Sequence, residues 1–211
     1  MHALPAPFAA ARLAACLALG PALSLALGLA LGLGTAAPAL AGPLADAAEK
    51  IEDRLSAQDY TTALDGARAF LGAVWDQVPQ IGFTQALLVS ETAAGYGVYN
   101  PRPTNLYKKG EAIIIYAEPF GFAYGAPGEG LHSIGFAVDL QVLDSQGAEL
   151  ASVPNVTQLD LNSRYENREF QANITYNLDG IAPGKYTLVT TMRDKNSDKS
   201  GSFRSDIEIT D

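Results

Sequence analysis

The sequence predicts a mainly β protein, with an antiparallel β-sandwich that follows an α-helical hairpin. From Leu44 to Val78, apolar residues recur every three or four positions, which is the period of an amphipathic helix. After Gln80 the apolar residues alternate with polar ones, which is the period of a half-buried strand. About seven such segments, separated by Gly, Pro, Asn and Asp, are typical of a sandwich or a barrel.

Residues 1–41 are predicted to be a secretory signal peptide. They contain no acidic residue, and an uncharged run rich in Leu, Ala and Gly extends from Leu13 to Gly34. Ala39-Leu40-Ala41 matches the small-x-small cleavage pattern, so we expect cleavage after Ala41. The 22-residue apolar run is also long enough to span a bilayer, so an uncleaved anchor is the alternative.

Cysteine and charge usage exclude several classes of function. Cys16 is the only cysteine, so a mature chain that begins at Gly42 has no disulfide, thiol nucleophile or thiolate metal site. Without Arg12, the remaining 13 basic and 23 acidic residues give a net charge of −10, which repels nucleic-acid phosphates. The predicted signal peptide implies a periplasmic or extracellular protein, and the negative charge implies that this protein binds no nucleic acid. It would contact the membrane only through an uncleaved N-terminal segment.

Residues 42–80 are predicted to form the helical hairpin. Asp59 is a suitable N-cap for the second helix, and Pro79 is expected to end it. The segment AQDYTTALDGARAFLGAVW resembles the second half of a tetratricopeptide unit. Because one such unit cannot bury its apolar face alone, we expect the hairpin to cover part of the following domain. The two apolar stripes comprise Leu44, Ala48, Ile51 and Leu55, and then Tyr60, Leu64, Ala67, Leu71, Val74 and Val78.

Residues 81–211 are predicted to form the β domain. Strands are indicated by GFTQALLVS, EAIIIYAE, VTQLDLN, KYTLVTTM and SFRSDIEIT, and by the alternating runs 134–142 and 170–178. The strand from Glu111 to Glu118 is apolar on both sides. It should therefore be central, and covered by the opposite sheet and the helical hairpin.

Two resemblances refine this architecture. The run LDGIAPGKYTLVTTMRD, with Tyr186, resembles the tyrosine corner of immunoglobulin-like (Ig-like) and fibronectin type III domains, which implies an Ig-like β-sandwich. The pattern Y-x-P-R-P-x-N-x-Y-x-x-G-E-x-I-x-I-Y-A-E, from Tyr99 to Glu118, resembles a family of uncharacterised exported bacterial proteins. That resemblance implies a helical lead before an all-β domain, and it implies no activity.

Catalytic residues are not evident in the sequence. His132, Ser133 and Asp139 supply the residue types of a hydrolase triad, but neighbouring strand residues point to opposite faces and no nucleophile elbow is present. Two carboxylates across a cleft could still hydrolyse glycosidic bonds. The candidates near the aromatic stretch are Glu91, Glu111, Glu118 and Glu129.

No cofactor or metal site is predicted. Asp194, Asn196 and Asp198 match positions 1, 3 and 5 of a calcium loop. Lys199 and Ser205 then stand where the loop needs a glycine and a glutamate. We therefore interpret residues 194–201 as a polar hairpin turn.

Aromatic residues on both sides of the central strand are the candidate binding residues. They could form a flat platform for a sugar or a peptide, or they could cap one end of the sandwich. The candidates are Tyr96, Tyr99, Arg102, Tyr107, Phe120, Phe122 and Tyr124. The expected function is that of an exported, non-enzymatic interaction module whose partner is an envelope protein or a glycan. The alternative is a carbohydrate-active or carbohydrate-binding protein.

Overall fold

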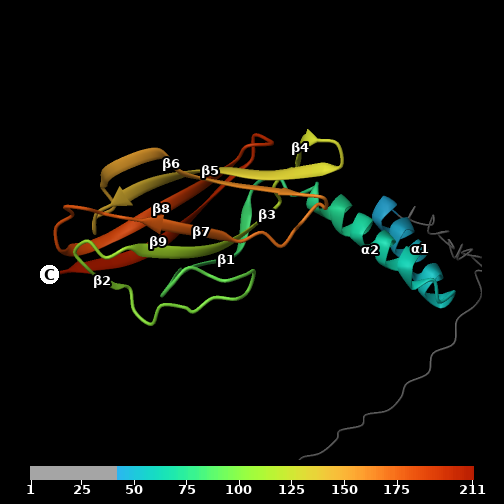
Figure 1. The fold of residues 1–211 in the computed structure, drawn as a ribbon, viewed down its shortest axis with the longest axis horizontal. Coiled ribbons are helices and arrows are strands. Elements are labelled where there is room, and N and C mark those ends of the chain that lie inside the picture. Colours follow the sequence, from blue (N-terminus) through green and yellow to red (C-terminus); the bar gives the residue numbers. More distant parts are fainter. Residues whose placement is uncertain (1–41) are drawn as a thin grey trace, which may run out of the picture. The chain divides into compact units, whose positions relative to one another are not determined.

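The computed structural model describes residues 42–211, and the predicted signal peptide lies outside the described residues. The described residues 42–211 belong to one compact unit. The helices are α1 (Pro43–Ser56) and α2 (Tyr60–Trp75) (Figure 1). The strands are β1 (Gly82–Val89), β2 (Leu106–Lys108), β3 (Ile113–Phe120), β4 (Gly125–Gly128), β5 (Leu131–Leu143), β6 (Glu149–Ser163), β7 (Ala172–Tyr176), β8 (Gly184–Asp194) and β9 (Ser200–Thr210). Neither helix of the described segment is long and apolar enough to cross a membrane.

The helical hairpin forms where the sequence predicts it. The Asp59 side chain accepts a hydrogen bond from the Thr62 amide at 3.3 Å, which is the expected N-cap of α2. The helices meet where Ile51 of α1 lies against Gly66 of α2. Ala63 is the one buried residue of α2, and α1 has none. The contact between the helices therefore covers little of their apolar surface.

The strands form two curled sheets, which confirms the mainly β class with a helical hairpin. The smaller sheet has the order β1-β3-β7, and the larger has the order β2-β9-β8-β5-β4, with β6 paired to β5. Neighbouring strands are antiparallel except for β2 and β9, which are parallel. The seven predicted segments all lie on strands. The short β2 and β4 were not predicted, since three or four residues are too few to show a period of two.

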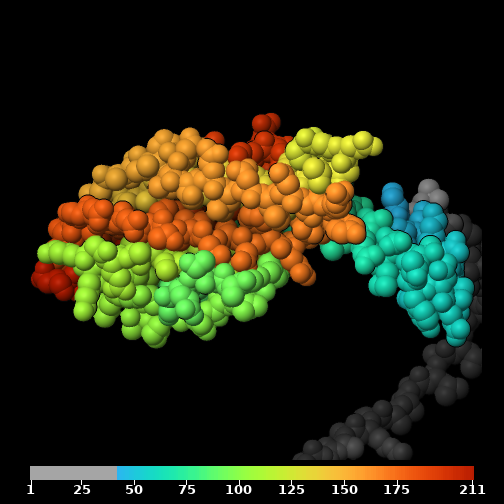
Figure 2. Space-filling model, viewed as in Figure 1, coloured from blue at the N-terminus to red at the C-terminus, as the bar shows by residue number. Residues whose placement is uncertain are grey.

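Apolar side chains of both sheets share one hydrophobic core. Ile113 and Ile115 of β3 point into this core and are fully buried, as expected for a central strand. The opposite side of β3 presents Tyr116, which packs with Val89 and Ala93. The segment after β1 therefore covers this side, and the prediction that the helical hairpin would do so is wrong. In Figure 2 the orange atoms around β7 lie beside the green atoms of the β1 and β3 region.

The Tyr186 hydroxyl donates a hydrogen bond to the Ala182 carbonyl at 2.8 Å. This bond joins the start of β8 to the connection before it, as the tyrosine-corner resemblance implies. A second local feature lies in β6, where Asn155 has a φ of 52° beside a shift in the register between β5 and β6. Arg193 of β8 donates to Asp139 from Nε at 2.8 Å and to the Asn155 side chain at 2.8 Å.

The Asp139 ion pair predicts a pH dependence of stability. The hydrogen bond from Arg193, aided by the Asn155 amide, holds the pKa of Asp139 below its usual value. A carboxyl with a lowered folded-state pKa stabilises the protein above its unfolded pKa, and this contribution is lost as the pH falls through the folded pKa. Asp139→Asn should lower the free energy of unfolding at pH 7 by about 1 kcal/mol and should weaken the loss of stability below pH 4. Urea unfolding at pH 7 and pH 3 measures both effects.

Asp160 provides a matched control for this prediction. It pairs with Lys195 at 2.7 Å, but its side chain is 60% exposed, compared with 25% for Asp139. Solvent screening should therefore keep the effect of Asp160→Asn small. An equal pH dependence in wild type and Asp139→Asn would contradict the assignment.

Candidate functional site

The seven predicted binding residues lie at three separate places. Tyr96 and Tyr99 belong to the segment that covers β3. Arg102 precedes β2, and Tyr107 lies in it. Phe120 is the last residue of β3, and Phe122 and Tyr124 follow it. Tyr107 and Phe122 are each 1% exposed, so neither ring faces solvent. Tyr96 is the most exposed of the predicted aromatics, at 39%. The predicted platform is therefore not formed as a single surface, and the binding role of the exposed members stays a prediction.

Arg102 stabilises the turn before β3 through two hydrogen bonds and a contact with an aromatic ring. Its Nη2 donates to the Leu106 carbonyl and to Glu111 Oε1, both at 2.7 Å, and its guanidinium lies 4.0 Å from the centre of the Tyr107 ring. The Lys108 amide donates to Glu111 Oε2 at 2.9 Å, and this bond, with that from Arg102, lowers the pKa of Glu111. The charged groups of Arg102 and Glu111 are thus paired with each other within the fold.

Tyr116 and Glu118 form a buried hydrogen-bonded pair under Tyr99. The Tyr116 hydroxyl donates to Glu118 at 2.6 Å and accepts from the Gly97 amide at 2.7 Å. Burial, followed by the hydrogen bond to Glu118, raises the pKa of Tyr116 to about 12. The Tyr99 ring stacks on Tyr116 with centroids 4.3 Å apart. This arrangement fixes the segment after β1 and leaves Glu118 only 5% exposed.

An aromatic cluster fixes the C-terminal end of α2 to the strands. Trp75 Nε1 donates to the Phe122 carbonyl at 2.7 Å, and the two rings meet edge to face at 5.0 Å. Phe122 also contacts Tyr124, Phe136 and Phe170 at centroid distances of 5.5, 5.6 and 6.1 Å. We call these five residues the aromatic anchor. Sequence reasoning missed the role of Trp75 because its partners lie far along the chain.

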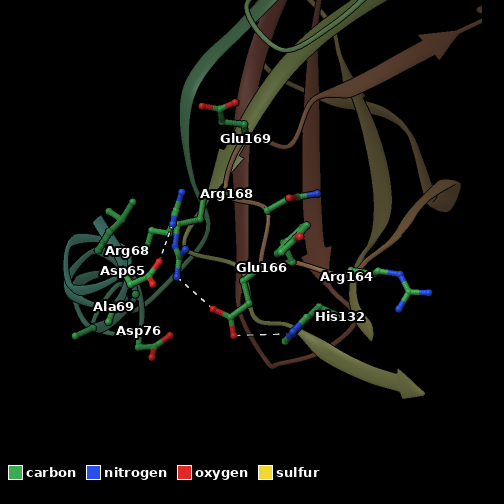
Figure 3. Close-up of a pocket in the computed structure, with 14 residues that line it drawn as sticks. Asp65, Arg68, Ala69, Asp76, His132, Arg164, Glu166, Arg168 and Glu169 are labelled. Atoms are coloured by element: carbon green, nitrogen blue, oxygen red, sulfur yellow. Dashed lines mark hydrogen bonds and ion pairs between the residues drawn. The ribbon is translucent and has the colours of Figure 1, made fainter. Parts of the chain in front are cut away.

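A polar hollow lies between α2 and the segment 164–169, with a volume of about 1180 Å³ (Figure 3). Its labelled polar residues are Asp65, Arg68, Asp76, His132, Arg164, Glu166, Arg168 and Glu169. Glu166 lies between Arg168 Nη2, at 3.4 Å, and His132 Nδ1, at 3.9 Å. Across the hollow, Arg68 pairs with Asp65 at 2.8 Å. The hollow therefore carries charges of both signs, several of which are already paired.

Arg168 connects the hollow to the aromatic anchor. Its guanidinium lies 5.8 Å from the centre of the Trp75 ring. It also packs against Gly72 of α2, where a Cβ would lie 2.9 Å from Nη2. A residue larger than glycine at this position would push the guanidinium away. The sequence gives no signal for this contact, since a glycine within a helix pattern does not indicate what approaches it.

Most of the candidate catalytic and metal-binding residues have hydrogen-bond partners within the fold, whereas Glu129 and Asp198 are exposed. Glu91 accepts from Asn100 at 2.7 Å, while Glu111 and Glu118 have the partners described above. Among residues 42–211, no group of three or more His, Cys, Asp or Glu lies close enough to hold a metal ion. Asp194 accepts hydrogen bonds from the Ala123 and Asn196 amides, at 2.8 and 3.0 Å, and thereby holds the β8–β9 turn against the loop after β3.

An apolar stripe along α2 is exposed on the surface. We define the α2 stripe as Tyr60, Leu64, Ala67, Leu71 and Val74. Their exposed fractions are 60% for Tyr60, 57% for Leu64, 48% for Leu71 and 39% for Val74, and Ala67 is also exposed. Leu44 and Leu55 of α1 are 40% and 48% exposed. The prediction that these stripes pack on the β domain is therefore wrong for these large side chains, which face solvent. Val78, the last residue of the predicted second stripe, is half-buried against Gly121 after β3.

These features define a mainly β domain with a helical hairpin whose apolar stripe is uncovered. No family model matches the sequence, and no curated protein matches it. Among solved structures, the chain is similar to a family 123 glycoside hydrolase from Clostridium perfringens, from a study of glycolipid glycan hydrolysis. The identity is 11% and the TM-score is 0.34 over 63% of this chain. The chain spans 28% of the length of that protein.

Proposed function

We propose that this chain is an exported, non-enzymatic interaction module that docks a partner in the cell envelope through its helical hairpin. The observation that carries the proposal is the exposed α2 stripe. Leu64 and Leu71 each leave about half of their surface in water. Clustered exposed apolar residues mark interaction sites more often than isolated ones do.

The way in which α2 is held supports this role. The aromatic anchor and Arg168 hold the C-terminal end of α2, through Trp75 and Gly72. The helix is therefore fixed at its C-terminal end, while Tyr60 and Leu64 remain more than half exposed and Leu71, which borders the polar hollow, is 48% exposed. A rigid helix that presents residues at i, i+4, i+7 and i+11 is a common recognition element, because its side chains need little ordering when a partner binds.

The finer architecture is part of the same proposal. We infer that the β domain is an Ig-like sandwich and that the chain belongs with the exported proteins it resembles. The bond from Tyr186 to the Ala182 carbonyl supports the first inference, as does the core shared by the two sheets. Export through residues 1–41 is supported by their sequence pattern.

Site-specific crosslinking in intact cells tests the docking role. A photo-crosslinking amino acid at Leu64 or Leu71 should give a discrete crosslinked product, because both side chains would lie inside the interface. The same amino acid at Ala69, an exposed residue about half a turn from the stripe, is the matched control and should give little product. Equal crosslinking at all three positions would contradict docking through the stripe.

Fractionation with N-terminal sequencing of the purified protein tests export and cleavage after Ala41.

A second candidate function is carbohydrate binding in the polar hollow. The observation that favours it is Tyr165, which lines the hollow and is 77% exposed, beside Glu166 and Glu169. An exposed aromatic ring near carboxylates can stack on a sugar and accept its hydroxyl hydrogen bonds. Calorimetric titration with envelope glycans should then show binding that Tyr165→Ala abolishes. Hydrolysis lost in Glu166→Gln with folding intact would favour an enzyme, and no heat of binding with any glycan would exclude this candidate.

A further inference from the structure

We propose that the partner of the α2 stripe is a second copy of this chain, paired with the first copy in antiparallel orientation along α2. This inference rests on the proposed function, since it names the partner of the same surface.

The spacing of the stripe is that of a helix-to-helix seam. Its five residues are separated by four, three, four and three positions, which is the a/d pattern of paired helices. A flat sheet or a loop would not require this spacing, whereas a second helix with the same spacing fits between its side chains. The α2 stripe of another copy provides such a helix.

The stripe is also symmetric in the positions of its residues and in its two leucines. Ala67 stands at its centre, Leu64 and Leu71 lie three and four residues away, and Tyr60 and Val74 each lie seven residues away. In an antiparallel pair centred on Ala67, each Leu64 would face Leu71 of the second copy. A two-fold interface requires this kind of self-complementarity. The small Ala67 at the axis allows the two helices to approach closely.

The charge of α2 favours the same partner. Its charged residues are Asp65 and Arg68, which pair with each other at 2.8 Å, so the helix is neutral overall. The formal charge of −9 on the whole chain disfavours an anionic lipid surface as the partner. A strongly basic partner would also gain little from a stripe that contains no charge. Two copies can therefore meet along this helix without repulsion at the contact.

Cysteine crosslinking tests the pair and its orientation. Cys16 is the only cysteine, so single cysteines can be placed in a Cys16→Ser background of the full chain, purified as its host processes it. Ala67→Cys should form a disulfide-linked dimer under mild oxidation, because the axis brings the two copies of this position together. Ala69→Cys is the matched control and should stay monomeric. Tyr60→Cys mixed with Val74→Cys should give the mixed dimer in preference to either self-linked dimer.

A charged variant tests the same interface without crosslinking. Leu64→Lys with Leu71→Lys should raise the dissociation constant of the dimer by roughly a hundredfold, as expected for the loss of two central interface residues. Sedimentation equilibrium measures this change, and an unchanged far-UV circular dichroism spectrum shows that the variant is folded. Both positions are exposed, so the fold should tolerate them.

The outcomes separate this inference from the proposed function. A monomer with no Ala67→Cys dimer would overturn self-pairing. If Leu64 still crosslinks to a different protein in cells, docking through the stripe stands with another partner. If neither product forms, both proposals fail. Equal self-linking of Tyr60→Cys and Val74→Cys, each with itself, would overturn the antiparallel orientation and indicate a parallel pair.

Discussion

Phe122→Ala is expected to lower the free energy of unfolding by about 3–5 kcal/mol, the usual cost of removing a large core aromatic. Phe122 is 1% exposed and contacts four other aromatic rings. Its removal would leave a cavity in the core and would also release Trp75, so the end of α2 should loosen. Urea unfolding followed by far-UV circular dichroism measures the loss of stability, and near-UV circular dichroism should report a weakened Trp75 signal.

Tyr165→Ala is the control for this substitution. Tyr165 is also aromatic, but it is 77% exposed, so its replacement should change stability by less than about 0.5 kcal/mol. If the two variants lose the same stability, or if Phe122→Ala costs less than about 1 kcal/mol, the aromatic anchor is not part of the core.

Asp194→Ala should be the second most damaging change, with a loss of about 3 kcal/mol, since each buried donor left without an acceptor costs about 1–3 kcal/mol. Its carboxylate, 6% exposed, accepts from the Ala123 and Asn196 amides and from Ser197 Oγ, at 2.5–3.0 Å. Without it, the β8–β9 turn and the loop that carries Phe122 would lose their connection. Differential scanning calorimetry measures the shift in the melting temperature.

Asp198 provides the comparison within the same turn. It is exposed, so Asp198→Ala should leave the melting temperature almost unchanged. The comparison also addresses the calcium-loop pattern. A metal site would need both aspartates, whereas a hydrogen-bonded turn needs Asp194 alone. Equal destabilisation by the two variants would contradict this assignment.

The strands and helices could be predicted because their signals are local. The alternation through β5 and β7 follows from one face packing on the core, and the N-cap at Asp59 needs only the next three residues. The central position of β3 was likewise evident from its isoleucines. These features depend on the spacing of apolar residues along the chain and on hydrogen bonds between close neighbours. Both can be inferred from the sequence.

The site could not be predicted because it depends on which segments meet. An amphipathic period shows that α2 has an apolar face, but it does not show what covers that face. The contact of Trp75 with Phe122 joins residues 47 positions apart, and the polar hollow joins α2 to segment 164–169. The expectation that the hairpin would cover β3 failed for the same reason, since Tyr116 is covered by the segment after β1.

Cysteine labelling in intact cells tests most directly the central claim, that the α2 stripe is a contact surface. In a Cys16→Ser background, Leu64→Cys and Ala69→Cys would be exposed to a water-soluble maleimide in cells and, separately, as dilute purified protein. We expect Leu64→Cys to react much more slowly in cells than when diluted, while Ala69→Cys reacts at the same rate in both. Equal labelling of Leu64→Cys in both conditions would contradict the account, because the stripe would then be open to water where the protein acts.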